Sequence, residues 1–336
     1  MIQSVDLIPL TYLRSKLDRA YERVMNSGTY IGGHEVKAFE QEWSEYNQQS
    51  YCVAVGNGFD ATQLLLRAMG VMPGDTVYVP AITAPPVWSA VNSLRATPVP
   101  FSVAKQLKTL LVYKEPAIFV NLYGQQTSID PSFKHSIEDC CQSHGLLPRL
   151  TSIASFYPTK NLGCYGDSGA ITTNSESLAE YLRSLHNYGS QGAINSRMDP
   201  LQAAFLRVKL PYLNDWNRQR TEQALWYNRY LQGYPLTLPD TTIPSVWHQY
   251  AISVDTRETR DALKEHLFTN GVQTQIHYPV PPHHLLSYNY DLPLANQWSS
   301  TTLSLPIGPH LKPSAIHLIS VVIQEFFHKR CTNYPV

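Results

Sequence analysis

The sequence has little charge and no long apolar run. Only 15% of its 336 residues are charged, and 26 Lys and Arg residues balance 26 Asp and Glu residues. This neutrality leaves no basic surface to neutralise a phosphate backbone, so nucleic acid is not the expected partner. No segment reaches the roughly 20 apolar residues that cross a bilayer, and residues 1–10 lack the basic flank and apolar stretch of a signal peptide. We therefore expect a soluble, cytoplasmic protein with a small-molecule partner and no membrane partner.

Cysteine is scarce as well. The five cysteines form no CxxC pair and show no metal-ligand spacing, so neither a disulfide framework nor a zinc site is indicated. Cys140 and Cys141 are interpreted as small buried side chains rather than nucleophiles. His277, His283 and His284 have no carboxylate or cysteine at ligand spacing, and we expect no metal.

The order of apolar patterns predicts a mostly parallel α/β sheet followed by a smaller domain. Helical stripes run from Leu13 to Val24 and from Val36 to Tyr46, and apolar runs alternate with helical spacing after them. A long polar helix around residues 211–220 leads into the second domain. We expect a large domain over residues 1–215 and a small α/β domain over residues 216–336. Strands are predicted at 52–56, 76–79, 117–122, 136–138, 250–254 and 273–276, and later helices near 260–267 and 316–326.

The segment GNGFDA, residues 56–61, is the first candidate site. Here a predicted strand ends in a glycine turn that opens a helix. Such a turn exposes unpaired backbone N–H groups at the positive end of the helix dipole, which suits a phosphate. The alternative is an ordinary turn, because glycine is common where a strand leads into a helix.

Two further segments carry Asp139 and Lys160. Asp139 follows a short strand, at the sheet edge where ligands bind in open α/β folds, although Asp is also a common helix cap. Gln142 and His144 are close by in the sequence and either bond a ligand or hold the loop. Lys160 lies in the turn-rich segment SFYPTKNLGCYGDSGA, residues 155–170, whereas most lysines are simply solvated.

A phosphate turn, a carboxylate and a lysine in a tight loop are together what pyridoxal phosphate needs. Asp139 would keep the pyridine nitrogen protonated, because an adjacent negative charge raises the pKa of a cation. Lys160 would hold the coenzyme aldehyde and later shuttle a proton during transamination. The three segments therefore predict a transamination site.

Seven motifs follow one another in the order found in a known family. They are SGTYIGG (27–33), GNGFDA (56–61), NLYGQ (121–125), EDCCQSHG (138–145), FYPTKNLGCYGDSGA (156–170), NSRMDPLQAAFLRVKL (195–210) and IHYPVPPH (276–283). The chain thereby resembles the pyridoxal-phosphate-dependent nucleotide-sugar aminotransferases of the DegT/DnrJ/EryC1/StrS group, nearly end to end. The resemblance implies a type I aspartate-aminotransferase fold and a homodimer with active sites at the subunit interface.

The resemblance also implies roles for single residues. Lys160 matches the lysine that binds the coenzyme, Asp139 the partner of the pyridine nitrogen, and Gln142 the residue beside the ring hydroxyl. The implied phosphate contacts are Gly58, Phe59, Ser155 and, from the other subunit, Asn195. The candidate substrate contacts are His277, Tyr278 and Tyr188, with a structural role as the alternative for His277 and Tyr278.

Within the family, the GNG turn, NYGSQ (187–191) and IHYPVPPH most resemble enzymes that aminate C3 of a dTDP-3-keto-6-deoxyhexose. This likeness implies a dTDP-linked substrate and glutamate as amine donor. The dTDP-aminosugar product would feed a bacterial surface polysaccharide, such as the O-antigen of lipopolysaccharide, or a secondary metabolite.

The chain also departs from the family pattern. Where members place an aromatic or a histidine over the coenzyme ring, this sequence has Ile82 and Ala84. Trp88, one helical turn on, is a candidate substitute, and an aliphatic cover is the alternative. The segments 101–116, 144–155 and 191–195 are shorter than is usual, and such loops often shape the sugar pocket.

Two other functions fit parts of this pattern. A non-catalytic homologue that binds a nucleotide sugar or the coenzyme would tolerate the short loops and the missing aromatic. A sugar dehydratase would use the same coenzyme, but the related 3-dehydratases carry histidine in place of the lysine. Lys160 together with Asp139, Gln142 and Ser155 favours transamination.

Overall fold

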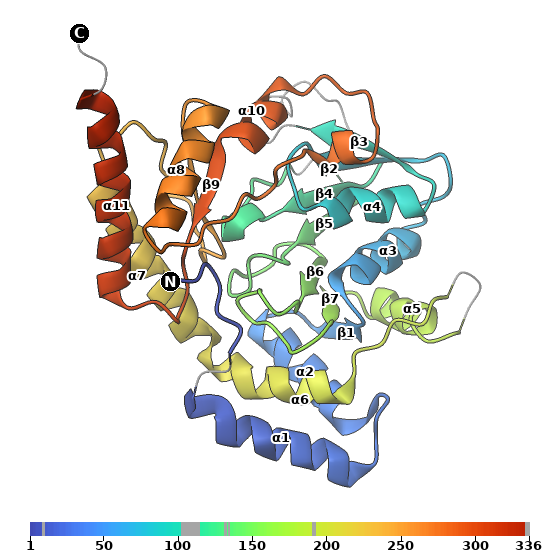
Figure 1. Ribbon diagram of the computed structural model, residues 1–336. Coiled ribbons are helices and arrows are strands. Elements are labelled where there is room, and N and C mark those ends of the chain that lie inside the picture. The colour runs from blue at the N-terminus through green and yellow to red at the C-terminus, as the bar shows by residue number, and fades with distance from the viewer. Residues whose placement is uncertain (9–10, 102–114, 131–132, 134, 190–192, 333–336) are drawn as a thin grey trace.

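The computed structural model describes residues 1–8, 11–101, 115–130, 133, 135–189 and 193–332. A seven-stranded sheet lies at its centre, and a two-stranded sheet with its own helices lies beside it (Figure 1). This arrangement confirms the predicted α/β fold with a mostly parallel large sheet. None of the described helices combines the length and apolarity needed to cross a membrane.

The central sheet has the strand order β1-β7-β6-β5-β4-β2-β3. Its middle is parallel, whereas β7 runs antiparallel to both β1 and β6. The carboxyl ends of β5 and β6 therefore meet at one edge of the sheet, where the predicted site lies. The strands are β1 (Tyr51–Val55), β2 (Thr76–Pro80), β3 (Thr97–Phe101), β4 (Ala117–Val120), β5 (Ser136–Asp139), β6 (Ser152–Ser155), β7 (Gly169–Thr173), β8 (Tyr250–Ser253) and β9 (Thr302–Leu305).

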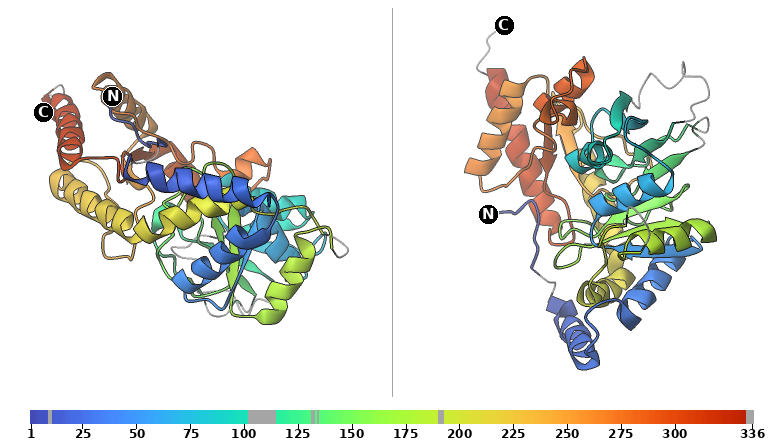
Figure 2. Two further views of the ribbon diagram at one scale, coloured as in Figure 1. Left: turned by 90° about the horizontal axis from the view of Figure 1, so that it is seen from below. Right: turned by 90° about the vertical axis from the view of Figure 1, so that its right-hand side faces the viewer.

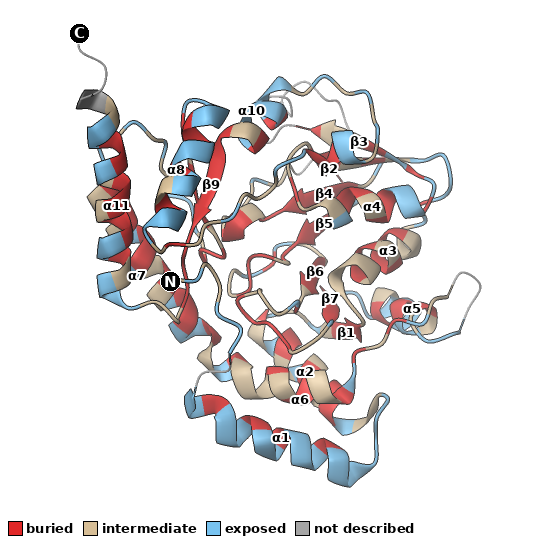
Figure 3. Ribbon diagram, viewed as in Figure 1, coloured by how far each residue is buried: buried red, intermediate tan, exposed pale blue. Residues whose placement is uncertain are grey.

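Helices cover both faces of this sheet, so its strands are buried on both sides (Figure 3). The alternation is visible in β1, where Val53 packs with α3, α4 and α5 while Ala54 packs with α2 and α6. The outer helix α1 lies on α6 (Figure 2). The helices are α1 (Arg14–Ser27), α2 (Gly33–Tyr46), α3 (Gly58–Ala68), α4 (Pro85–Ser93), α5 (Glu176–Leu185), α6 (Pro200–Lys209), α7 (Leu213–Leu231), α8 (Arg257–Thr269), α9 (Pro282–Leu285), α10 (Pro293–Thr301) and α11 (Pro313–Thr332).

The small unit has its own core, in which side chains of α7, α8 and α11 pack on the antiparallel pair β8 and β9. The predicted boundary near residue 215 falls within α7. The N-terminus crosses this boundary, because Ile2 pairs with Val272: its N–H donates to Gly271 O at 2.7 Å and its carbonyl accepts from Gln273 N at 2.9 Å. Residues at the start of the chain thus join the small unit.

The predicted strand at 273–276 is wrong. In the structure this segment makes only isolated bridges, such as Gln275 opposite Ser304, and it continues no ladder. Ile276, the one apolar residue of this segment, packs with the preceding Val272 at the core of the small unit. Two of the segments predicted to be short lie partly outside the described residues, namely 102–114 of the segment 101–116 and 191–192 of the segment 191–195.

Candidate active site

Asp139 and Lys160 lie near each other at the carboxyl edge of the sheet. Asp139 ends β5 and is buried, and its Oδ1 accepts the N–H of Cys141 at 2.9 Å. Burial raises its pKa, and the nearby positive charge of Lys160 works against that rise. Burial likewise lowers the pKa of Lys160, with the Cys141 thiol and Asp139 opposing it. The two groups are therefore close enough for each to shift the pKa of the other.

The amino end of α3 meets the end of β6 at Gly58. A Cβ on Gly58 would lie 2.7 Å from Ser155 Cβ and 3.2 Å from Cys141 Sγ, so the helix backbone approaches the strand more closely than a side chain allows. Phe59 is half-buried in the first turn. Because first-turn N–H groups have no partner within their own helix, they are available to an anion at this point. The structure thus places Gly58, Phe59 and Ser155 together.

Gln142 connects the large sheet to the small unit. Its Oε1 accepts the N–H of Tyr123 at 2.6 Å, and its Nε2 donates to the hydroxyl of Tyr278 at 2.8 Å. The Tyr123 hydroxyl donates to the carbonyl of His277, and the His277 ring contacts Ser304 Oγ through Nδ1 at 3.0 Å. Two predicted substrate contacts are thereby fixed beside a predicted cofactor contact.

Two histidines near Lys160 are held neutral. His144 is buried, and burial together with the charge of Lys160 lowers its pKa to about 3. Its Nδ1 accepts the N–H of Leu162 at 3.3 Å, while its Nε2 is buried without a partner. The same two causes lower the pKa of His277 to about 4. At neutral pH neither ring adds charge to the site.

Asn195 and Tyr188 lie apart from this group within the one chain that the structure contains. Asn195 is exposed and pairs through its backbone with Asn187. Tyr188 is also exposed, with the guanidinium of Arg197 5.5 Å from its ring centre. No described contact joins either residue to Lys160, and their exposure leaves them accessible to a second subunit.

Trp88 lies in the core and not on an open surface. Its side chain has no exposed area, its Nε1 donates to Pro80 O at 2.9 Å, and the rings of His283, Tyr288 and Tyr290 surround it. A ring that covers a cofactor needs an accessible face. This placement does not support the interpretation of Trp88 as a substitute for the missing aromatic.

Sequence reasoning missed the network that holds the α3 turn. Ser196 Oγ accepts the N–H of Gly56 at 3.0 Å and donates to Asp60 Oδ2 at 2.6 Å, while Asn57 caps the helix by accepting Asp60 N–H at 2.8 Å. In the motif NSRMDP the sequence analysis assigns a role to Asn195 and none to Ser196. The only sequence signal for Ser196 is its position next to Asn195, and this is weak because its partner Gly56 is 140 positions away.

The family model for the DegT/DnrJ/EryC1/StrS aminotransferases matches residues 12–324. The chain belongs to this family. It is a pyridoxal-phosphate-dependent aminotransferase, as the family is. The resemblance found in the seven motifs is thereby confirmed, and so is the predicted cofactor.

Relatives of this aminotransferase act on sugars linked to different nucleotides. It is 39% identical over 353 aligned positions to a dTDP-3-amino-3,4,6-trideoxy-alpha-D-glucose transaminase from Streptomyces venezuelae, with 92% of each chain covered. It is 32% identical over 360 positions to a UDP-2-acetamido-2-deoxy-3-oxo-D-glucuronate aminotransferase from Pseudomonas aeruginosa, covering 96% of this chain and 99% of the relative. The structure of S. venezuelae DesV with a ketimine intermediate superposes with a TM-score of 0.87 at 36% identity, covering 94% and 95%.

The residues present fit the coenzyme of this aminotransferase family. A buried carboxylate at Asp139 suits a protonated ring nitrogen, and Lys160 with a lowered pKa suits an aldehyde. The close approach at Gly58 brings the first turn of α3 next to Ser155, so that first-turn N–H groups and the Ser155 hydroxyl lie near one another as phosphate donors. We assign these three contacts to the ring nitrogen, the aldehyde and the phosphate as a proposal drawn from the fit.

Proposed function

We propose that this aminotransferase carries an amino group from glutamate to a dTDP-linked 3-keto-6-deoxyhexose. The observation that carries the proposal is that Lys160 interacts with Asp139 and Cys141, and that the α3 turn packs on Cys141 and Ser155, in a chain 39% identical to a dTDP-aminosugar transaminase. The product would be a dTDP-aminosugar for a bacterial glycan, such as an O-antigen, or for a secondary metabolite. Catalysis would take place in the cytoplasm, in a homodimer whose sites are shared between subunits.

Each residue has a defined task in this proposal. The bound coenzyme supplies an electron-accepting ring that stabilises charge on the carbon next to the transferred nitrogen. Lys160 would move the proton that leaves the carbon bearing the transferred nitrogen, and its lowered pKa suits this task because a neutral amine is the base. Asp139 would keep the ring nitrogen protonated. Gln142, held by Tyr123 and Tyr278, sets the position of the ring edge.

The nucleotide is the least constrained part of the proposal. Relatives with dTDP-linked and UDP-linked substrates both align over more than nine-tenths of the chain. The higher identity to the dTDP relative, 39% against 32%, favours dTDP. His277 and Tyr278 are proposed to line the sugar pocket beside Gln142, and Asn195 and Tyr188 are proposed to reach the site of the second subunit.

A substrate panel tests the proposal. Purified protein loaded with coenzyme is given glutamate and, in parallel, dTDP- and UDP-linked 3-ketosugars and 4-ketosugars, and the aminosugar formed is measured by mass. We expect the dTDP-3-ketosugar to give the highest kcat/KM, with Lys160→Ala as the blank. Faster turnover of a UDP-sugar would overturn the nucleotide assignment, and no turnover of any ketosugar would overturn the proposed function.

A further inference from the structure

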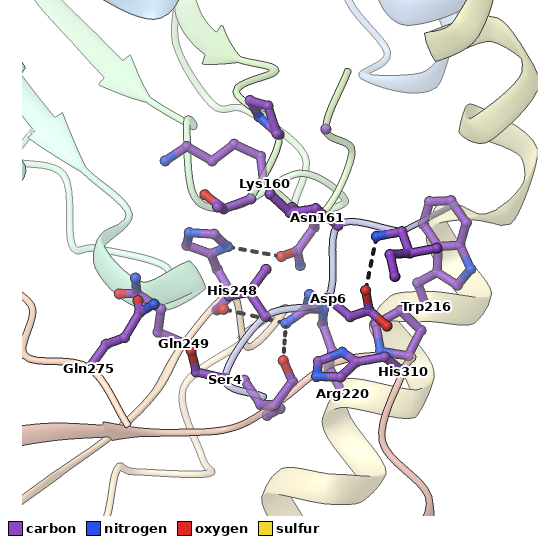
Figure 4. A pocket seen from close by; sticks show the side chains of 18 of the residues that line it. Ser4, Asp6, Lys160, Asn161, Trp216, Arg220, His248, Gln249, Gln275 and His310 are labelled. Atoms are coloured by element: carbon purple, nitrogen blue, oxygen red, sulfur yellow. Dashed lines mark hydrogen bonds between the residues drawn. The ribbon is translucent and has the colours of Figure 1, made fainter. Parts of the chain in front are cut away.

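One cavity reaches from Lys160 to a cluster around Arg220 between the two units of the molecule (Figure 4). It has a volume of about 170 Å³ and is walled by the segment Ser4–Ile8, the Lys160 loop and the small unit. Its lining residues include three cationic side chains, on Lys160, Lys209 and Arg220, and a single carboxylate, on Asp6. A cavity with this excess of positive charge favours an anionic ligand.

Arg220 is buried in the wall of this cavity with most of its hydrogen-bonding capacity unused. Only 8% of the residue is exposed. Nη1 donates to the carbonyls of Trp247, His248 and Ile307 at 3.1 to 3.3 Å, while Nε is buried and has no hydrogen-bond partner in the described part of the chain. Among the described residues no carboxylate forms a salt bridge with it, which is unusual for a buried charge. Burial lowers the pKa of Arg220 to about 10, so the guanidinium keeps its charge at neutral pH.

A glycine allows Arg220 and His310 to approach the backbone closely. A Cβ on Gly308 would lie 3.3 Å from Arg220 Nη2 and 2.8 Å from His310 Nδ1, so any side chain at this position would push against both nitrogens. His310 Nε2 lies 3.2 Å from the carbonyl of Gln3, which fixes the ring against the N-terminal segment. In Figure 4, Arg220, His310 and Asp6 lie together at the end of the cavity away from the Lys160 amine.

We propose that Arg220, where it lies beside Gly308 and His310, forms an oxyanion subsite that binds a carboxylate or phosphate group of a substrate. Nη2 is the guanidinium nitrogen that has no acceptor among the described residues and is not enclosed, and its N–H groups can donate to an oxygen of one such group. Asp6 does not fill this place, because its Oδ1 accepts the N–H of Ile8 at 2.9 Å and it forms no salt bridge with Arg220. The subsite rests on the proposed function for the source of the anion, which is either the amine donor or the nucleotide.

Binding of unreactive anions tests the subsite without turnover. Holoenzyme is titrated calorimetrically with glutarate, dTDP and sulfate, and glutarate and dTDP separate the two sources. We expect one of them to bind, and Arg220→Lys and Gly308→Ala to weaken that binding by roughly ten- to a hundredfold, because the lysine loses the guanidinium donors and the alanine Cβ would lie 3.3 Å from Arg220 Nη2. Arg218→Lys, on the same helix with a side chain 67% exposed, is the matched control and should bind as the wild type does.

A further variant leaves the buried arginine intact. Asp6→Asn removes the one carboxylate of the lining and should tighten binding of the same anion. This variant keeps Arg220, so it tests the subsite even if the Arg220 variant fails to fold. Unchanged affinity in both Gly308→Ala and Asp6→Asn would overturn the subsite. Attachment of the coenzyme at Lys160 is followed separately by borohydride reduction, and its absence would overturn the proposed function and not the subsite.

Discussion

At the scale of single residues, burial sets the chemistry of Asp139 and Lys160. The low polarity around Lys160 lowers its pKa, so more of the amine is neutral at a given pH than in a solvated lysine. Asp139 has its pKa raised by the same burial, yet the Cys141 N–H and the Lys160 charge both favour its anionic form. The neighbouring thiols of Cys140 and Cys141 have raised pKa values because of burial, which agrees with their interpretation as unreactive.

Replacement of Lys160 by alanine should abolish covalent attachment of the coenzyme and transamination together. We expect at least a roughly hundredfold loss of kcat, since the variant lacks the group proposed to move the proton. The measurement is reduction with borohydride followed by mass analysis of the peptide that contains residue 160. An adduct at another lysine, or appreciable turnover by the variant, would contradict the assignment.

Asp139→Asn should move the pH dependence of coenzyme attachment to lower pH. The negative charge of Asp139 raises the pKa of Lys160, so its removal lowers that pKa and leaves the amine neutral in more acidic solution. The variant should also lose most of its turnover, because the ring nitrogen loses its charged partner. Attachment rates of apoenzyme and coenzyme measured from pH 5 to 9 test the shift, and a midpoint that stays in place or rises would count against the pairing.

At the scale of elements, the α3 turn depends on contacts between distant segments. Asn57 caps the helix locally, while Ser196 ties Gly56 to Asp60 across the sheet edge. A second glycine, Gly169 at the start of β7, allows the turn to pack closely, because a Cβ there would lie 2.5 Å from the Asn57 carbonyl. The position of the turn is thus fixed by Asn57, by Ser196 and by the close packing at Gly169.

Gly58→Ala should weaken coenzyme binding by roughly ten- to a hundredfold. The new Cβ would lie 2.7 Å from Ser155 Cβ, so either the helix start or the end of β6 must move. Equilibrium dialysis of the apoenzyme with the coenzyme measures the change. Gly166→Ala is the matched control, because its Cβ would meet only the flexible end of Gln202 at 3.2 Å. Equal affinities in both variants would remove the α3 turn from the phosphate site.

Elements that are marked by neighbouring residues could be predicted from the sequence, whereas contacts between distant segments could not. The GNG turn lies between a predicted strand and a predicted helix, and Asp139 directly follows a predicted strand, so the order of residues alone predicts both. Residues 273–276 contain one apolar side chain, Ile276, and have no partner strand along their length, and pairing partners are not visible in one sequence. The helical spacing of Trp88 fits both a ring that covers the coenzyme and a ring in the core. Its packing against Tyr288 and Tyr290, two hundred positions later, places it in the core.

At the scale of the whole molecule, the chain closes one side of its cavity with its own N-terminus. Ile2 is fastened to the small unit at Val272, while Leu13 is part of the core beneath the large sheet. The segment Ser4–Ile8 between them lines the cavity that Lys160 and Arg220 share. A movement of the small unit relative to the large sheet would therefore also move the segment Ser4–Ile8 that lines the cavity.

The proposed homodimer is tested by mixing two inactive variants. Lys160→Ala and Asn195→Ala each impair every site of their own dimer if a site takes its lysine from one subunit and its asparagine from the other. A mixed dimer then contains one site with both changes and one with neither. With random exchange half of the dimers are mixed, so activity should recover to about a quarter of the wild-type value. Activity is assayed after unfolding and refolding the two variants together, with each refolded alone as the control. Because Asn195 is exposed and remote from Lys160 within its own chain, a site built from one subunit would give no recovery on mixing.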